Sequence, residues 1–419
     1  MRASVLMTTF IYNPQKSVMY GHTVLSWLTG ANWPSKYSYF LELVREGEIG
    51  IVFDHHGSSS PIKLFQNKLL AKLFGWVECF IWMKMNGLKI TKTKFTFGTN
   101  KLIKGDVLFL FASEHLQSYP IPDWTAPNDE VIKLIHFSHY FFRTFEIAEN
   151  LKSIKNSVMV SEIDLCTRSL FYKKYFLLND NKSFILPFAV QRRFKDEKTF
   201  HLRQKKALAV GSFMTFKRAD YNQAMCDFYD TNTIHPLRKI IWQNRNAIED
   251  KIVCKISYIN EFWSLVDLED LNGIRSRVAF FKNFFIKKFS RNYGKSNHFK
   301  EDIVEQYNSF QMVVSTEEAG ELPSIGTFEA MACGCAAICS SNVEYKSLGM
   351  IAGLHYVEYD GTFENLLEKI DFYKTHQKDL ALIAKSGKIF VREMFRVKSI
   401  KKIFLEGSDN QSTKSNNIY

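Results

Sequence analysis

The sequence lacks any run of about 18 uncharged apolar residues, which is the length a helix needs to cross a bilayer. The most apolar long window, 69–85, is interrupted by Lys72, Glu78 and Lys84. The first residues also lack the pattern of a secretory signal, because a short apolar stretch gives way at once to polar residues. We therefore expect a cytoplasmic protein without a transmembrane helix.

Paired cysteines and metal-binding spacings are also missing. The seven cysteines are odd in number and scattered among apolar runs. Cys333, Cys335 and Cys339 cluster, but no histidine or second cysteine pair lies at the spacing of zinc ligands. We expect buried free thiols in a reducing compartment, and neither a metal nor another cofactor.

Acidic residues are in deficit, and the formal net charge is +12. An excess of this size is compatible with nucleic acid, an anionic membrane surface or small phosphorylated substrates, and charge alone does not choose among them. The 419 residues, 46% hydrophobic, are enough for two packed cores, and a single core rarely grows to this size. Two domains are therefore expected.

Apolar runs alternate with helical patterns along most of the chain, which predicts a parallel α/β architecture with two Rossmann-like domains. Strands are expected at 3–8, 49–53, 106–110, 131–136, 157–160 and 183–188, and in the second half at 206–211, 251–256, 311–315 and 336–339. Helices are expected at 35–45, 63–85, 139–151, from about 219, and at 300–307, 329–333 and 363–394.

The polar stretch 187–205 predicts the joint between the domains. We expect an N-terminal domain over 1–193 and a C-terminal domain over 205–385. A final helix is expected at 386–406. The polar residues 407–419, rich in Ser and Asn, predict a disordered tail.

The segment from Thr316 to Cys339 carries the clearest chemistry. A loop rich in glycine and acids follows a predicted strand and leads into a helix that opens near Gly326 or Thr327. Free backbone N–H groups and the positive end of the helix dipole favour a phosphate, and glycines such as Gly320 and Gly326 admit a ligand to the backbone. Carboxylates suit hydroxyl groups instead. A phosphate between two hydroxyl-bearing rings is a nucleotide sugar, so the donor-binding candidates here are Glu318, Gly320, Ser324, Ile325, Gly326, Thr327 and Glu329.

This segment resembles the donor-binding motif of GT-B fold glycosyltransferases, in particular the retaining family 4. Glu321 and Glu329 have the family's spacing, and Glu329-Ala-Met-Ala-Cys-Gly334 matches the family's sequence, although Ala336 replaces the usual proline. The resemblance implies that Glu329 binds the ribose hydroxyls and that Glu321 faces the sugar. Because Pro323-Ser324 is offset by one residue, Glu318 and Glu317 remain alternatives for the sugar-facing acid.

A second stretch, 207–218, resembles the opening strand of the family's donor domain. Gly211 matches, but Ser212 stands where the family has an arginine, and Arg218 falls where it has a lysine. Lys217 and Arg218 are predicted to neutralise the departing phosphate, and Gly211 and Ser212 to border the donor. The segment 185–194 resembles the interdomain segment of the same family.

Four histidines follow predicted strands. Asp54-His55-His56 is similar to metal-dependent phosphoesterases, but the further aspartates of those enzymes are missing. In a GT-B protein His55, His56 and His136 would lie on the acceptor side, and His139 would orient the acceptor hydroxyl or contact the donor. His136 and His139 are equally explained as hydrogen-bonded structural residues.

Two stretches, 63–89 and 280–300, interleave lysine and arginine with aromatic residues. Such faces suit the headgroup layer of an anionic membrane, and they equally fit a core-facing aromatic stripe with a solvated basic side. Stacking on RNA is a third interpretation, but no RNA-binding motif is present, so no nucleic-acid partner is expected.

The sequence thus predicts a GT-B glycosyltransferase with two Rossmann-like domains facing a central cleft, peripheral at the inner face of the cell membrane. It would transfer a hexose-type sugar from a nucleotide sugar to a glycan or lipid-linked acceptor, with retention, in surface polysaccharide or lipopolysaccharide synthesis. The alternatives are a degenerate GT-B module that binds a glycan or partner without turnover, a sugar-nucleotide epimerase on the same fold, and a basic RNA-binding protein.

Overall fold

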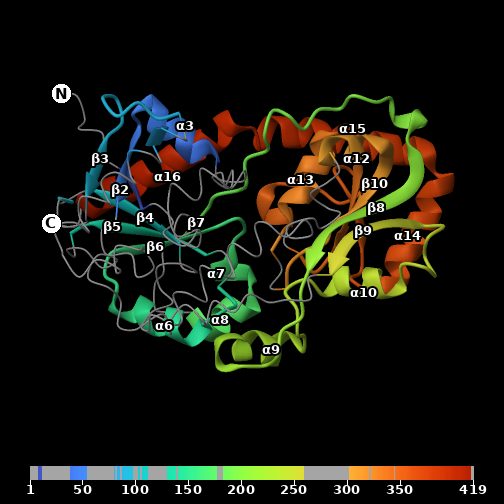
Figure 1. Ribbon diagram of the computed structural model, residues 1–419, viewed down its shortest axis with the longest axis horizontal. Helices are drawn as coiled ribbons and strands as arrows, with labels where there is room; N and C mark the ends of the chain where they lie inside the picture. The colour runs from blue at the N-terminus through green and yellow to red at the C-terminus, as the bar shows by residue number, and fades with distance from the viewer. Residues whose placement is uncertain are drawn as a thin grey trace, which may run out of the picture. The chain divides into compact units, whose positions relative to one another are not determined.

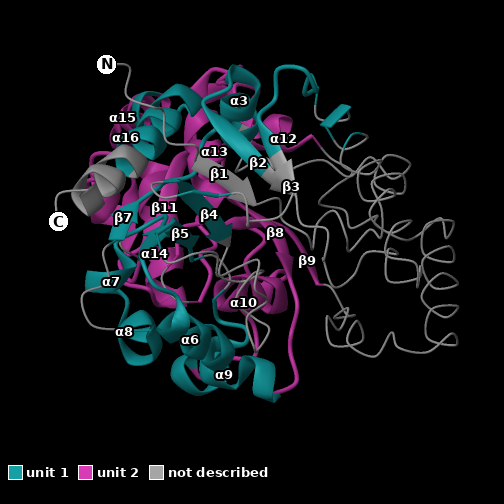
Figure 2. Cartoon of the chain, turned by 90° about the vertical axis from the view of Figure 1, so that its left-hand side faces the viewer, with its two compact units in different colours: residues 1–191, 219–229, 393–419 teal, residues 192–218, 230–392 magenta. Residues whose placement is uncertain are grey.

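The computed structural model gives the fold over most of the chain. The described residues are 8–11, 38–53, 80, 83–84, 87–97, 102–103, 106–111, 130–137, 140–176, 183–258, 302–319, 322–343 and 345–416. They form two compact units (Figure 2). Unit 1 comprises residues 1–191, 219–229 and 393–419, and unit 2 comprises residues 192–218 and 230–392.

Unit 1 is built on a parallel sheet with the strand order β3-β2-β1-β4-β5-β6-β7. Residues 107–110 of β4 and all of β5 are buried, most of them Val, Ile, Leu or Phe, as is typical of strands covered on both faces, and Lys133 and His136 of β5 are buried with them. The strands are β1 (Thr8–Ile11), β2 (Ile49–Phe53), β3 (Phe95–Phe97), β4 (Val107–Phe111), β5 (Ile132–His136), β6 (Ser157–Ser161) and β7 (Ser183–Ile185).

The helices of unit 1 come from three separate parts of the chain. They are α3 (Ser38–Glu46), α6 (Thr144–Ser153), α7 (Leu165–Arg168), α8 (Leu170–Phe176), α9 (Gln223–Tyr229) and α16 (Val397–Asn416), with a 3₁₀ turn at Asp220–Asn222. The prediction of a disordered tail from 407 is wrong for 407–416, because α16 continues to Asn416. Packing supports the extension: a Cβ on Gly407 would lie 3.0 Å from the ring of Phe184.

The segment 219–229 was expected to open the first crossover of the C-terminal domain, but it packs in unit 1. Figure 1 shows α9 beside α6 and α8, and the ring of Tyr229 stacks on that of Phe171 with centroids 5.5 Å apart. The backbone N–H of Arg143 also donates to the carbonyl of Tyr221 at 2.5 Å. Aromatic packing therefore separates this segment from its neighbours in sequence.

Unit 2 is built on a second parallel sheet with the order β12-β11-β10-β8-β9. Its strands are β8 (Gln204–Phe213), β9 (Ile252–Tyr258), β10 (Phe310–Val314), β11 (Ala336–Ser340) and β12 (Val357–Tyr359). Its helices are α10 (Pro236–Asn244), α12 (Ile303–Ser309), α13 (Ile325–Ala332), α14 (Phe363–Thr375) and α15 (Gln377–Met394), with 3₁₀ turns at Phe200–Leu202 and Tyr345–Leu348.

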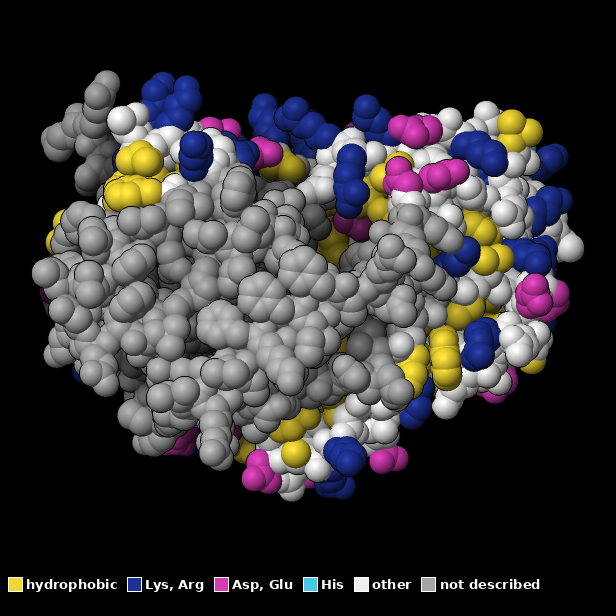
Figure 3. Space-filling view, in the orientation of Figure 1, with side chains coloured by type: hydrophobic (Ala, Val, Ile, Leu, Met, Phe, Trp, Pro, Cys, Tyr) yellow, Lys and Arg dark blue, Asp and Glu magenta, His cyan; other side chains and the backbone are white. Residues whose placement is uncertain are grey.

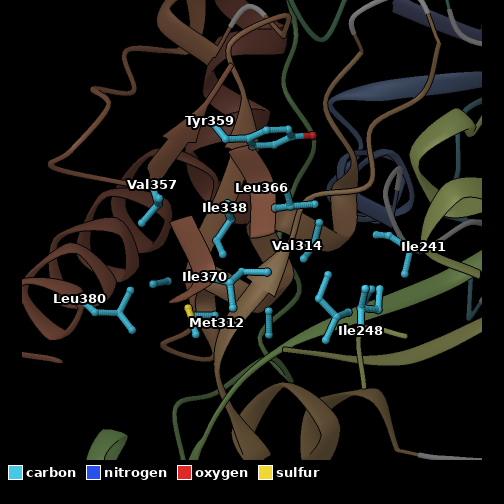
Figure 4. Close-up of a cluster of buried hydrophobic side chains, with 14 of the residues drawn as sticks. Ile241, Ile248, Met312, Val314, Ile338, Val357, Tyr359, Leu366, Ile370 and Leu380 are labelled. Atoms are coloured by element: carbon cyan, nitrogen blue, oxygen red, sulfur yellow. The ribbon is translucent and has the colours of Figure 1, made fainter. Parts of the chain in front are cut away.

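Alternation along the strands of unit 2 builds its core. Alternate residues such as Met312 and Val314 of β10 join side chains of α10, α14 and α15 in one buried cluster (Figure 4). Helices α12 and α13 contribute no residue to this cluster, although both contact β10, so they cover the other face of the sheet. The two layers fix α10 and α13 at opposite faces of the same strand edge.

The fold class predicted from the sequence, α/β with two Rossmann-like parallel sheets, is confirmed by these two units. The cleft expected between two domains stays a prediction. None of the helices within the described ranges combines the length and the apolar composition that a membrane span requires.

Candidate functional site

The strand order of unit 2 reverses direction between β8 and β10. From β8 the chain moves to β9 on one side, and β10 then pairs with β8 on the other side. Ligands of open α/β sheets bind outside the carboxyl ends of the strands at such a switch point. At this edge β8 ends at Phe213, one residue after Ser212, and β10 ends at Val314, two residues before Thr316.

Arg238, in the first turn of α10, joins the two segments. Its Nη1 donates to the carbonyl of Ser212 at 2.8 Å, its Nε to Oγ1 of Thr316 at 2.9 Å, and its Nη2 to the carbonyl of Thr316 at 3.3 Å. Burial lowers the pKa of Arg238, and the nearby carboxylates of Glu318 and Glu317 oppose that shift. A guanidinium keeps its proton even so, and a half-buried positive charge therefore lies at the switch point.

Gly211, predicted to border the donor, is what admits this arginine. It has φ +125°, and a Cβ added to it would lie 2.8 Å from Cζ of Arg238. Both the backbone conformation and the space therefore require glycine. The match of Gly211 to the family motif is explained here by a contact within the protein.

The acidic loop after β10 is tied to the segment that enters α10. The backbone N–H of Ala319 donates to the carbonyl of Ile234 at 2.7 Å, and that of Glu318 to the carbonyl of Leu322 at 3.3 Å. The loop thus folds back on itself between Glu318 and Leu322. Of the candidate acids here, Glu317 is buried and Glu318 is half-buried near Arg238.

Glu317 ends a buried chain of hydroxyl groups. The hydroxyl of Tyr345 donates to Oε1 of Glu317 at 2.9 Å and lies 2.8 Å from Oγ of Ser315, which in turn contacts Oγ1 of Thr327 at 2.5 Å. Burial raises the pKa of Glu317 to about 7, against the hydrogen bonds that lower it. Thr327, a predicted donor-binding residue, is buried within this chain, which fixes the first turn of α13 to the end of β10.

The amino end of α13 leaves its backbone donors without a side-chain cap. Ser324 occupies the N-cap position, with Ile325 as the first helical residue, and the Ser324 side chain makes no capping hydrogen bond. Gly326 follows, and a Cβ there would lie 3.1 Å from the hydroxyl of Tyr307. We predicted that this glycine gives a ligand access to the backbone, but the structure shows Tyr307 against it.

Glu329, one turn further along α13, has an unusual environment for a carboxylate. Its side chain is half-buried, and no described residue donates a hydrogen bond to it. Burial raises its pKa to about 8, although the positive charge of Arg193 acts in the opposite direction. Neither carboxylate oxygen of Glu329 therefore receives a hydrogen bond from a described residue, although α13 begins at the switch point.

The carboxyl end of α13 is fixed by local backbone hydrogen bonds and a glycine. Gly334 has φ +84° and donates to the carbonyl of Met331, and Cys335 donates to that of Ala330, which is a Schellman motif. Burial raises the pKa values of Cys333 and Cys335 to about 12, so these thiols stay protonated. The described residues contain no group of His, Cys, Asp and Glu side chains that could hold a metal ion.

Of the remaining predicted residues, the structure describes Lys217, Arg218 and His136. Lys217 and Arg218 are exposed on the loop after β8. His136 ends β5 in unit 1, where its ring is buried, lies 3.5 Å from Oε1 of Glu162 and contacts Phe109. An acceptor-facing role for His136 does not fit this burial. The residues Gly320, Glu321, His55, His56 and His139 lie outside the described residues, as do the stretch 280–300 and most of 63–89.

Sequence reasoning missed Arg238, Tyr307 and Tyr345. One signal was available for Arg238: Pro236 is the first residue of α10, and proline is favoured at that position of a helix. Placing the crossover helix at Pro236 instead of at 219 puts an arginine in its first turn, beside the strand end.

Part of the chain matches a known protein family. Residues 268–402 match the model of a family described as glycosyl transferase-like, which covers less than half of the chain. None of the curated proteins that were compared matches the chain.

Solved structures resemble the chain at low identity. Sucrose-phosphate synthase from Thermosynechococcus elongatus has a TM-score of 0.47 at 11% identity, over 98% of this chain and 100% of that one. The N-terminal domain of Candida albicans trehalose-6-phosphate phosphatase has 0.48 at 11%, over 98% and 99%. Anabaena HepE in complex with UDP and glucose has 0.44 at 10%, over 97% and 100%. Likeness at this level assigns no function to the chain.

Proposed function

We propose that the chain is a glycosyltransferase that binds a nucleotide-sugar donor at the carboxyl edge of the sheet of unit 2. The observation that carries the proposal is Glu329, a half-buried carboxylate on α13 to which no described residue donates a hydrogen bond. A ribose offers two adjacent hydroxyl groups, which suit two carboxylate oxygens. The match of residues 268–402 to the glycosyl transferase-like family supports the assignment.

The same edge offers groups for the phosphates. The uncapped N-terminus of α13 presents backbone N–H groups and the positive end of the helix dipole. Arg238 adds a positive charge at the switch point. Hydrogen-bond acceptors for hydroxyl groups and hydrogen-bond donors for phosphate oxygens therefore occur together, which is the combination that a nucleotide sugar requires.

The reaction follows from this donor. The bond between the anomeric carbon and the diphosphate oxygen breaks, and the diphosphate keeps the electron pair. The acceptor oxygen bonds to the same carbon and gives up its proton, which the departing phosphate can accept. Positive charge near the diphosphate stabilises the negative charge that develops on it. The sugar-facing acid comes from the loop that contains Glu317, Glu318 and Glu321.

The finer parts of the proposal come from the motif. We propose transfer of a hexose-type sugar with retention to a glycan or lipid-linked acceptor, in surface polysaccharide or lipopolysaccharide synthesis, without a metal. The protein would work in the cytoplasm at the inner face of the membrane. On the face of unit 2 seen in Figure 3, Lys and Arg are interspersed with Asp and Glu. The candidates for the membrane contact come from the sequence, where the stretches 63–89 and 280–300 combine basic and aromatic residues.

A panel of nucleotide sugars tests the proposal. We expect at least one to raise the Tm of the wild type, and Glu329→Gln to weaken its binding about 10-fold or more, since the amide replaces one of the two oxygens with an NH2 group that cannot accept a hydrogen bond. Glu364→Gln is the matched control, because Glu364 is an exposed acid in the first turn of α14.

The outcomes separate the alternatives. Stabilisation by no nucleotide sugar contradicts the proposal. Unchanged binding by Glu329→Gln removes Glu329 as the ribose ligand. Binding without nucleoside diphosphate release in the presence of candidate acceptors favours the module without turnover, and an epimerised sugar nucleotide favours the epimerase. Retention is read from the anomeric configuration of the product.

A further inference from the structure

We propose that Arg238 binds the diphosphate of the donor and replaces the arginine that the family motif has at the position of Ser212. The inference rests on the proposed function and names the residue that recognises the donor's anionic part. The position of the guanidinium supports it. Arg238 bonds to the carbonyl of Ser212 itself at 2.8 Å, so a positive charge lies beside the residue where the motif would have placed one.

The hydrogen-bond partners of Arg238 are all neutral, and Glu318 and Glu317, the acidic residues near it in the described part of the chain, act on it without forming an ion pair. All three hydrogen bonds go to neutral oxygens, namely Oγ1 and the carbonyl of Thr316 and the carbonyl of Ser212. Across the described part of the chain, no carboxylate lies within ion-pair distance of the guanidinium. A half-buried cation held only by neutral acceptors is suited to an anion brought by a ligand.

The geometry also leaves the correct donors. A guanidinium has five N–H groups, and the three hydrogen bonds use one on each nitrogen. One N–H therefore remains on each of Nη1 and Nη2, without an acceptor among the described residues. Two N–H groups from adjacent nitrogens form the fork that binds two phosphate oxygens.

The backbone is shaped for this side chain. Gly211 adopts φ +125°, and any Cβ at this position would lie within 2.9 Å of both Cζ and Nε of Arg238. Thr316, which follows the neighbouring strand β10, accepts two hydrogen bonds from the guanidinium and so fixes its position. Because β8 and β10 flank the switch point, the cation is held where open α/β sheets bind their ligands.

Binding measurements on two ligands test the inference. The probes are the nucleoside diphosphate whose base is that of the best stabilising nucleotide sugar, and the corresponding nucleoside monophosphate. In Arg238→Gln we expect the Kd for the diphosphate to rise about 10- to 100-fold and that for the monophosphate much less, so that the wild-type preference for the diphosphate falls. Arg238→Lys keeps the charge but loses the fork, and should show about a 10-fold rise for the diphosphate.

Arg245→Gln is the control, because Arg245 is an exposed arginine at the other end of α10, where it lies over the ring of Trp242 and donates to its carbonyl. The inference is overturned if Arg238→Gln binds the diphosphate within about twofold of the wild type, or loses both ligands equally, as a purely structural residue would. If Arg238→Gln does not unfold cooperatively, Arg238→Lys decides by the same ratio. A wild type that binds no nucleotide overturns the proposed function as well, whereas a binding wild type with an unaffected Arg238→Gln overturns only this inference.

Discussion

The two ends of β8 in unit 2 each carry an arginine, and the two are held in different ways. Arg203, just before β8, is buried and donates to Asp196, to the carbonyl of Lys198 at 2.8 Å and to that of Cys333 at 2.9 Å. Asn308 also accepts from it at 3.3 Å. Arg238, beyond the other end of β8, is half-buried and has only neutral partners.

The contrast shows what each edge of the sheet does. At the amino edge, Asp196 neutralises Arg203, receives a second bond from Lys388 at 2.6 Å, and packs against Gly334. That network joins the segment before β8 to the end of α13. The carboxyl edge differs, because Arg238, Glu329 and the amino end of α13 keep hydrogen-bond donors and acceptors that the described residues do not use. The amino edge is thus held together by partners within the protein, and the carboxyl edge keeps the groups that we propose for donor binding.

Arg203→Gln tests the amino edge and should have the largest effect. Removing one partner of a buried ion pair costs about 3–5 kcal/mol, so the Tm should fall by roughly 6–12 °C or more. Thermal unfolding measures it, with Arg245→Gln as an exposed arginine control. A fall no larger than that of the control would mean that the Arg203 network does not hold the fold together.

Gly211→Ala tests how closely the carboxyl edge is built around Arg238. A side chain at φ +125° that also clashes with the guanidinium should cost about 2–3 kcal/mol and displace Arg238. Gly353→Ala is the matched control, because Gly353 has φ +75° with nothing within 4 Å of its added Cβ, and it should cost about 1 kcal/mol. Equal losses of Tm in the two variants would show that Arg238 can move aside freely.

Glu329→Gln should have the smallest effect on the free energy of unfolding, and in the opposite direction. The folded pKa of about 8 lies above the ordinary 4.5, so the folded state holds its proton more tightly. The wild type therefore loses stability as the pH rises from about 4.5 to about 8, and the variant does not. A rise of the pKa from 4.5 to about 8 corresponds to at most about 4–5 kcal/mol at pH 8.5. Because solvent screens this half-buried carboxylate, we expect the variant to be more stable by about 1–2 kcal/mol at pH 8.5 and unchanged at pH 4, measured by urea unfolding.

A wild type whose stability relative to Glu329→Gln does not depend on pH would contradict the burial of this carboxylate. Combined with weaker nucleotide binding by the same variant, the predicted result would show a residue that costs stability and serves binding. That outcome would sharpen the contrast with Arg203, whose loss should lower stability.

Much of the fold could be predicted from apolar patterning. The strands at 49–53 and 336–339 and the helices within 363–394 were placed within a residue or two, because buried parallel strands are continuous runs of apolar residues. Errors arose where a segment packs away from its neighbours in sequence. The residues 219–229 are helical in pattern, but tertiary contacts such as those of Phe228 and Tyr229 with Phe171 assign them to unit 1.

The site divides in the same way. The segment from Thr316 to Cys339 specifies its own chemistry, because the order strand, acidic loop and helix is local and its spacing can be read directly. The sequence by itself therefore determined that a helix N-terminus and the carboxylate of Glu329 would follow β10. Only the tertiary structure decided that Arg238 lies beside Thr316, since 78 residues separate the two and parallel pairing of β8 with β10 brings them together. The pattern of a single segment cannot encode a contact that depends on which strands become neighbours.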